Sequence, residues 1–179
     1  MTLLEVKELL IENNITFSET RFSSISEFCS YLTPYMINKD DTIQVIALII
    51  KSDNGQKHIA LEFIDENNDG NYTFYDLYFG QYFYELFDCE EEQLSKSILD
   101  EINSIISNNV VVIVGNDLKN GKWLWDSIFD KNENDGFGLP GFEKAMQRIK
   151  KPKSFLSKLK KSKNQYEIFD WNTYQCIVK

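Results

Sequence analysis

Residues 43–64 read IQVIALIIKSDNGQKHIALEFI, and this stretch predicts the centre of the fold. Its first part, residues 43–51, is rich in β-branched residues, which favour β-strands. An Asn-Gly pair follows at Asn54 and Gly55, and such a pair between two apolar runs is a strong signal for a β-hairpin. We therefore expect two antiparallel strands here, with residues 58–64 forming the second.

The segments on both sides of this hairpin continue with strand and helix patterns. Residues 72–79 predict a third strand, and the valine-rich residues 110–114 predict a strand that is buried on both faces. The C-terminal residues 166–179 predict a strand or a hairpin around Asn172. Apolar residues at steps of three and four predict helices, which we place at residues 3–11 (with Thr2 and Glu5 as a capping box), 24–32 or 26–32, 90–106, 141–150 and 154–162.

The order of these elements predicts an α+β fold. We expect a single domain over residues 1–179, with one mainly antiparallel sheet and helices packed at its face and ends. A chain of 179 residues with 42% hydrophobic residues can bury a full core without disulfide bonds. The sequence contains neither an internal repeat nor a linker long enough to divide it.

Unpaired cysteines and the absence of a secretory signal pattern predict a cytoplasmic protein, and the histidine content limits its chemistry. The three cysteines are widely separated and indicate neither a disulfide framework nor a zinc motif. His58 is the single histidine, so most His-based catalysis and metal binding is excluded. The N-terminal residues lack the basic start of a secretory signal, and the apolar run at residues 45–50 is far shorter than the roughly 20 residues that span a bilayer.

Charged residues are distributed very unevenly along the chain. The formal net charge is −9, from 19 basic and 28 acidic residues. Residues 62–101 hold twelve acids and one base, Lys96, whereas residues 144–163 hold nine bases and no acid. Acidic residues among tyrosines and phenylalanines suit a basic partner protein, such as a nuclease with a phosphate-binding cleft. For the helix predicted at residues 154–162 of this basic segment, we expect packing on the acidic body, with nucleic-acid binding as the alternative.

The acidic stretch also supplies the candidate partner-binding residues. We expect eight carboxylates and one tyrosine to contact the partner: Asp65, Asp69, Tyr75, Asp76, Glu85, Asp88, Glu90, Glu91 and Glu92. For any one of these carboxylates, a simple role in keeping the surface soluble is the alternative explanation.

Patterns for catalysis and metal binding are weaker. Residues 65–76 have the oxygen spacing of a calcium-binding EF-hand loop, but a turn rich in Asn, Asp and Gly explains them as well, and their flanks are not helical. A cysteine with His58 would make a minimal catalytic dyad, yet no spacing supports a pairing. Acidic pairs such as Asp126 and Asp130 arise by chance among 28 acids. We therefore predict no catalytic residue, no metal and no cofactor.

The same acidic and aromatic segments carry a family resemblance. The chain resembles bacterial immunity proteins of the polymorphic-toxin and contact-dependent growth inhibition systems, through FDCEEEQ at residues 87–93, NYTFYDLYF at residues 71–79 and YEIFDWNTYQC at residues 166–176. The resemblance implies binding and neutralisation of a cognate toxin domain, often a basic nuclease. The net negative charge opposes direct binding to nucleic acid, and we expect no membrane partner. A hydrolase or transferase with a carboxylate or metal site, and a regulatory inhibitor that mimics nucleic acid, are the alternatives.

Overall fold

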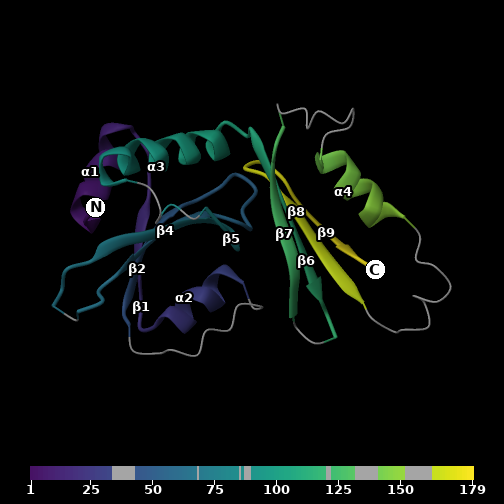
Figure 1. Cartoon of the computed structure of the whole chain (residues 1–179), viewed down its shortest axis with the longest axis horizontal. Helices are drawn as coiled ribbons and strands as arrows, with labels where there is room; N and C mark the ends of the chain where they lie inside the picture. Colours follow the sequence, from purple (N-terminus) through teal and green to yellow (C-terminus); the bar gives the residue numbers. More distant parts are fainter. Residues whose placement is uncertain are drawn as a thin grey trace.

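The computed structural model describes residues 1–33, 43–67, 69–84, 86, 90–119, 122–131, 141–151 and 163–179. Within these residues the chain forms four helices and two antiparallel sheets (Figure 1). The predicted α+β fold is confirmed. Its strands divide between two sheets, whereas the sequence suggested one.

Sheet A is a five-stranded meander in which each strand pairs with the next one along the chain. Its strands, in spatial order, are β1 (Ser18–Phe22), β2 (Val45–Ile50), β3 (Ile59–Ile64), β4 (Thr73–Phe79) and β5 (Tyr82–Phe83). Strands β2 and β3 are the predicted hairpin, and every residue of both is buried. Burial is complete because alternate side chains enter two different apolar clusters, one on each face of the sheet.

Sheet B contains the remaining strands in the order β7 (Lys122–Asp130), β6 (Val110–Asp117), β8 (Asn164–Phe169) and β9 (Tyr174–Val178). The valine-rich strand is buried on both faces, as predicted, since β6 sits between β7 and β8 and contributes to two apolar clusters. The C-terminal segment forms a hairpin, one of the two predicted alternatives, with β8 and β9 paired from Phe169 opposite Tyr174 to Gln165 opposite Val178.

The helices cover the faces of the two sheets. Helices α1 (Leu3–Glu12) and α3 (Glu91–Ile106) lie over one face of sheet A, and their apolar residues join the main core, which continues into sheet B (Figure 1). The predicted capping box of α1 is present at Thr2 and Glu5. Helix α2 (Ile25–Leu32) covers the other face of sheet A, and α4 (Gly141–Lys150) covers the outer face of sheet B.

The structure describes only part of the basic segment. Residues 144–150 of the basic segment lie in α4, which packs on sheet B through Ile149, and the predicted helix at residues 154–162 lies outside the described residues. Among the described helices, none is both long enough and apolar enough to cross a bilayer.

Polar contacts join the two sheets where the β2–β3 connection meets the β8–β9 turn. The Asn54 backbone N–H donates to the Trp171 carbonyl at 2.9 Å, and the Asn54 side-chain amide donates to the Asp170 carbonyl at 2.6 Å. Close by, the Lys57 Nζ atom lies 3.0 Å from Glu167 Oε2 in an ion pair that is almost completely buried. We call this set of contacts the inter-sheet clip.

Candidate functional site

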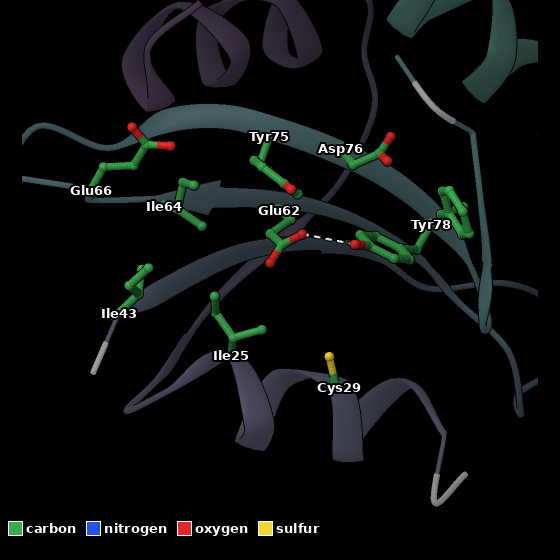
Figure 2. Close-up of a pocket in the computed structure, with 10 residues that line it drawn as sticks. Ile25, Cys29, Ile43, Glu62, Ile64, Glu66, Tyr75, Asp76 and Tyr78 are labelled. Carbon is green, nitrogen blue, oxygen red and sulfur yellow. Dashed lines mark hydrogen bonds between the residues drawn. The ribbon is translucent and has the colours of Figure 1, made fainter. Parts of the chain in front are cut away.

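A pocket of about 430 Å³ opens between helix α2 and the sheet A face that this helix covers (Figure 2). We call it the carboxylate pocket. Its described lining consists of three carboxylates, three aromatic rings, three isoleucines and a thiol: Glu62, Glu66, Asp76, Tyr75, Tyr78, Phe83, Ile25, Ile43, Ile64 and Cys29. The described lining includes no basic side chain, so its formal charge is negative.

Strand alternation and one bulge position the polar side chains. Ala60, Glu62 and Ile64 alternate with core residues of β3, so they face helix α2 rather than the main core. Glu62 is paired in register with Asp76, whereas Phe63 is paired with Phe74, which leaves Tyr75 as the extra residue of a β-bulge. Bulges change the direction of nearby side chains. Here the bulge places two consecutive residues of β4 along one pocket.

Glu62 is the most unusual group of the pocket. Glu62 has only 2% of its surface exposed, and its Oε2 atom accepts a hydrogen bond from the Tyr78 hydroxyl at 2.9 Å (Figure 2). No lysine, arginine or histidine of the described residues forms an ion pair with it. Burial raises the pKa of Glu62 to about 7; the Tyr78 hydrogen bond opposes this rise, and the nearby Asp76 charge adds to it. Glu62 is therefore close to half-protonated at neutral pH.

Asp76 and Tyr78 are held by their surroundings. The Asp76 carboxylate is buried, and its Oδ1 atom accepts backbone N–H groups from Leu77 at 2.7 Å and from Leu86 at 3.2 Å. The Tyr78 ring lies edge-on to Phe28 of α2, with 5.4 Å between ring centroids, and 6.4 Å from the Phe83 ring. Burial and the Glu62 charge raise the pKa of the Tyr78 hydroxyl, so Tyr78 stays neutral and serves as a donor.

The mouth of the pocket is exposed to solvent. Glu66 is exposed, Tyr75 has 46% of its surface exposed, and Phe83 has 39%. The pocket thus combines a buried polar floor with an accessible rim of one carboxylate and two rings. Such a combination suits a ligand with a positive charge and an apolar stem.

The predicted partner-binding residues have different positions in the structure. Tyr75 and Asp76 line the carboxylate pocket. Asp65 is buried, and its carboxylate accepts the N–H groups of Asp69 and Gly70, so it organises the β3–β4 turn. Asp69 is exposed in the same turn and accepts the Asn71 N–H, which lowers the pKa of Asp69. The predicted acidic surface is therefore interrupted, because carboxylates at 65 and 76 are directed to backbone donors.

The remaining candidates lie around the start of α3. Glu90 is exposed at the N-cap position, where its side chain makes no capping hydrogen bond. Glu85 and Asp88 lie outside the described residues, as do the side chains of Glu91 and Glu92.

Sequence reasoning missed Glu62 and Glu66 as members of a site. Glu62 stands alone between apolar residues in the sequence IALEFI, in a strand whose neighbours on the chain are all buried. A single acid at such a position is a signal for a special environment, because an unpaired buried carboxylate is costly. Its partners come from β4 and α2, and the sequence pattern does not show which strands become neighbours.

The alternative metal and nucleophile patterns have structural explanations. The proposed calcium loop is the connection between strands β3 and β4 rather than a loop between helices, and no metal-binding group of three or more acidic, cysteine or histidine side chains occurs in the described ranges. His58 accepts the Ser52 backbone N–H at its Nδ1 atom, 3.1 Å away, and burial lowers its pKa. Cys29 lines the carboxylate pocket, whereas His58 does not.

Comparison with known proteins does not assign this chain to a family. No protein-family model, no curated protein and no solved structure matches the chain. The evidence on function therefore comes from the pocket and from the charge pattern.

Proposed function

We propose that this protein is an immunity protein that binds and neutralises a cognate toxin domain, of the basic nuclease type, through the carboxylate pocket and its rim. The observation that carries the proposal is the meeting of three carboxylates and three aromatic rings in one open pocket, with no described basic residue in its lining. Uncompensated negative charge speeds the approach of a cationic protein, and exposed aromatic rings supply contact energy once the two surfaces meet.

Two features of the chain agree with this proposal. Its net charge of −9 opposes binding to nucleic acid but favours a basic protein. Cys29 and Cys176 are free thiols, which suits a protein that acts in the reducing cytoplasm.

Co-purification with the product of the adjacent gene tests the proposed function. We expect a complex that forms at low salt and weakens at high salt, because ions screen the exposed charges of the rim. Glu66→Lys and Tyr75→Ala change exposed residues, so both variants should fold and bind at least tenfold more weakly.

Glu8→Lys is the matched control for this experiment. Glu8 lies with Glu5 and Glu12 in a second acidic hollow, along helix α1, which has no aromatic ring in its described lining. This control should bind as tightly as the native chain. Equal loss in the control and in Glu66→Lys would show that only net charge matters, and no loss in either rim variant would contradict the proposed site.

One observation favours a second candidate function, a hydrolase or transferase. A carboxyl group with a pKa of about 7, such as Glu62, has the protonation balance of a general acid or base. This candidate predicts turnover of an ester, glycoside or phosphoester substrate that Glu62→Gln abolishes. The immunity function predicts no turnover in either protein.

A further inference from the structure

We propose that the carboxylate pocket is a receptor for one arginine side chain, with the guanidinium group against Glu62 and the methylene stem along Ile25 and Ile43. The inference rests on the proposed function only for the identity of the protein that carries the arginine. Its own support comes from hydrogen-bonding capacity, from the rings and from the apolar walls of the pocket.

The first argument is an unused acceptor on a buried side chain. Glu62 Oε2 accepts the Tyr78 hydroxyl, but no described residue donates a hydrogen bond to Glu62 Oε1. Glu62 is more than nine-tenths buried, lines the pocket and points into the space between the sheet and helix α2 (Figure 2). Glu62 Oε1 is not among the fully buried atoms without a partner, so it is open to the pocket and a ligand can reach it. A ligand N–H at this oxygen would form a charge-assisted hydrogen bond with a carboxylate that is otherwise largely removed from water.

The second argument concerns the walls. Tyr75 and Phe83 present partly exposed rings at the mouth, and guanidinium groups stack on aromatic faces. Ile25 and Ile43 line the opposite side, and isoleucine side chains suit the apolar stem of a long basic residue. Tyr78 is fixed between Phe28 and Phe83, so the floor of the pocket is already ordered before a ligand arrives.

These features favour arginine over lysine. A guanidinium is planar, weakly hydrated and able to donate to a carboxylate while it stacks on a ring. An ammonium is strongly hydrated, and it needs acceptors around a point charge. The pocket offers one free oxygen on a buried floor with rings beside it, which matches the planar group.

Titration of the protein with N-acetyl-arginine N-methylamide tests the assignment, with backbone amide NMR shifts as the readout. We expect saturable shifts at Glu62, Tyr75 and Tyr78. The citrulline analogue has nearly the same shape but no charge, and it should bind at least tenfold more weakly, while the lysine analogue should bind several-fold more weakly. Equal shifts from the arginine and citrulline analogues would overturn the proposal.

Variants localise the effect. Glu62→Gln should abolish saturable binding of the arginine analogue, and Tyr75→Ala, at an exposed position, should weaken it several-fold even if Glu62→Gln folds poorly. Glu8→Gln, in the acidic hollow along α1, should leave binding unchanged. Shifts that centre on α1, or that persist fully in both pocket variants, would contradict the assignment.

Binding should also depend on pH, because the arginine needs an ionised Glu62. The other described titratable groups that line the pocket are the Cys29 thiol from α2, Glu66 after β3, and Tyr75, Asp76 and Tyr78 from β4. With a Glu62 pKa of about 7, affinity for the arginine analogue should rise about tenfold from pH 6 to pH 8. Constant affinity over this range would contradict a contact between the guanidinium and Glu62.

The outcomes separate this inference from the proposed function. If the arginine analogue binds but no complex forms with the product of the adjacent gene, the pocket assignment stands and the immunity function fails. If the complex forms and the analogue does not bind, the immunity function stands and the arginine receptor fails.

Discussion

Glu62 and Glu167 are glutamates buried in the two different sheets, at 2% and 7% exposure, but of the two only Glu167 forms an ion pair with a described cation. In the inter-sheet clip, the Lys57 ammonium lies 3.0 Å from Glu167 Oε2, and the Tyr174 hydroxyl donates to Oε1 at 2.7 Å. In the carboxylate pocket, Glu62 has one hydroxyl donor and no described ion pair.

Glu167 therefore has a structural role, whereas the carboxylate of Glu62 can still bind a cationic ligand. Both oxygens of Glu167 have partners within the chain, so its charge joins strand β8 to the β2–β3 connection and is compensated there. The charge of Glu62 is only partly compensated, and burial makes it unfavourable. A cationic ligand would relieve that cost, whereas the chain itself gains little from keeping a carboxylate there.

The largest expected change in stability comes from removing the charge of Glu167. Glu167→Gln leaves the Lys57 ammonium buried without a counter-charge, and loss of one partner of a buried ion pair costs about 3–5 kcal/mol. We expect the free energy of unfolding at pH 7, measured by urea denaturation, to fall by roughly this amount.

A double variant provides the control. Changing both Lys57 and Glu167 to methionine removes the two charges together, and replacement of a buried pair by apolar residues is often neutral. The double variant should therefore be more stable than Glu167→Gln alone. If Glu167→Gln were as stable as the native chain, the clip would not depend on this ion pair.

Removing the charge of Glu62 should have the opposite effect, an increase in the free energy of unfolding at high pH. Its folded pKa of about 7 lies above the ordinary glutamate value of 4.5, so between these two pH values the folded state keeps a proton that the unfolded state has lost. The free energy of unfolding therefore decreases as pH rises through this window. This difference in pKa corresponds to about 3 kcal/mol of stability. That stability is fully present below pH 4.5 and is lost by pH 8.

Glu62→Gln isolates this contribution from the other titrating groups. We expect the variant to be more stable than the native chain at pH 8 by roughly 1–3 kcal/mol, with little difference at pH 5, in urea denaturation at both pH values. The same pH slope in both proteins would mean that Glu62 titrates normally in the folded state.

Much of the fold could be predicted because its signals are local. The Asn-Gly connection, the β-branched runs of β2 and β3 and the capping box of α1 each act within a few residues. Strand β1 was missed because its sequence, SETRF, buries only Phe22 fully and shows no clear apolar alternation. The division into two sheets was missed because β6 pairs with β8 across a long stretch of sequence.

The candidate site was predicted only in part for a similar reason. The acidic composition of residues 62–101 indicated a negative surface, and two residues predicted there, Tyr75 and Asp76, do line the pocket. Composition alone could not show which carboxylates are buried and which are exposed. Asp65 and Asp76 accept backbone hydrogen bonds, and this role depends on the path of the chain around them. Glu62 becomes unusual only when α2 and β4 cover it.

The smallest expected change in stability comes from removing the hydrogen bond that the Tyr78 hydroxyl donates to Glu62. In Tyr78→Phe the ring still packs between Phe28 and Phe83, but Glu62 loses its donor. Because this bond lowers the pKa of Glu62, its removal should raise that pKa, as followed by NMR of the side-chain carboxyl carbon. Stability at pH 8, where Glu62 is ionised, should fall by about 1 kcal/mol, with a smaller loss at pH 5.

The corresponding change in the clip is Tyr174→Phe, which removes a hydroxyl donor from Glu167 but leaves the Lys57 ion pair in place. Since the ammonium still compensates the Glu167 charge, the stability loss in this variant should be similar at pH 5 and pH 8. A loss that depends on pH in Tyr78→Phe but not in Tyr174→Phe would confirm that the two buried glutamates differ in compensation. If the pKa of Glu62 fell in Tyr78→Phe, the hydroxyl could not be stabilising the carboxylate, and the unused acceptor of the pocket would have to be reassigned.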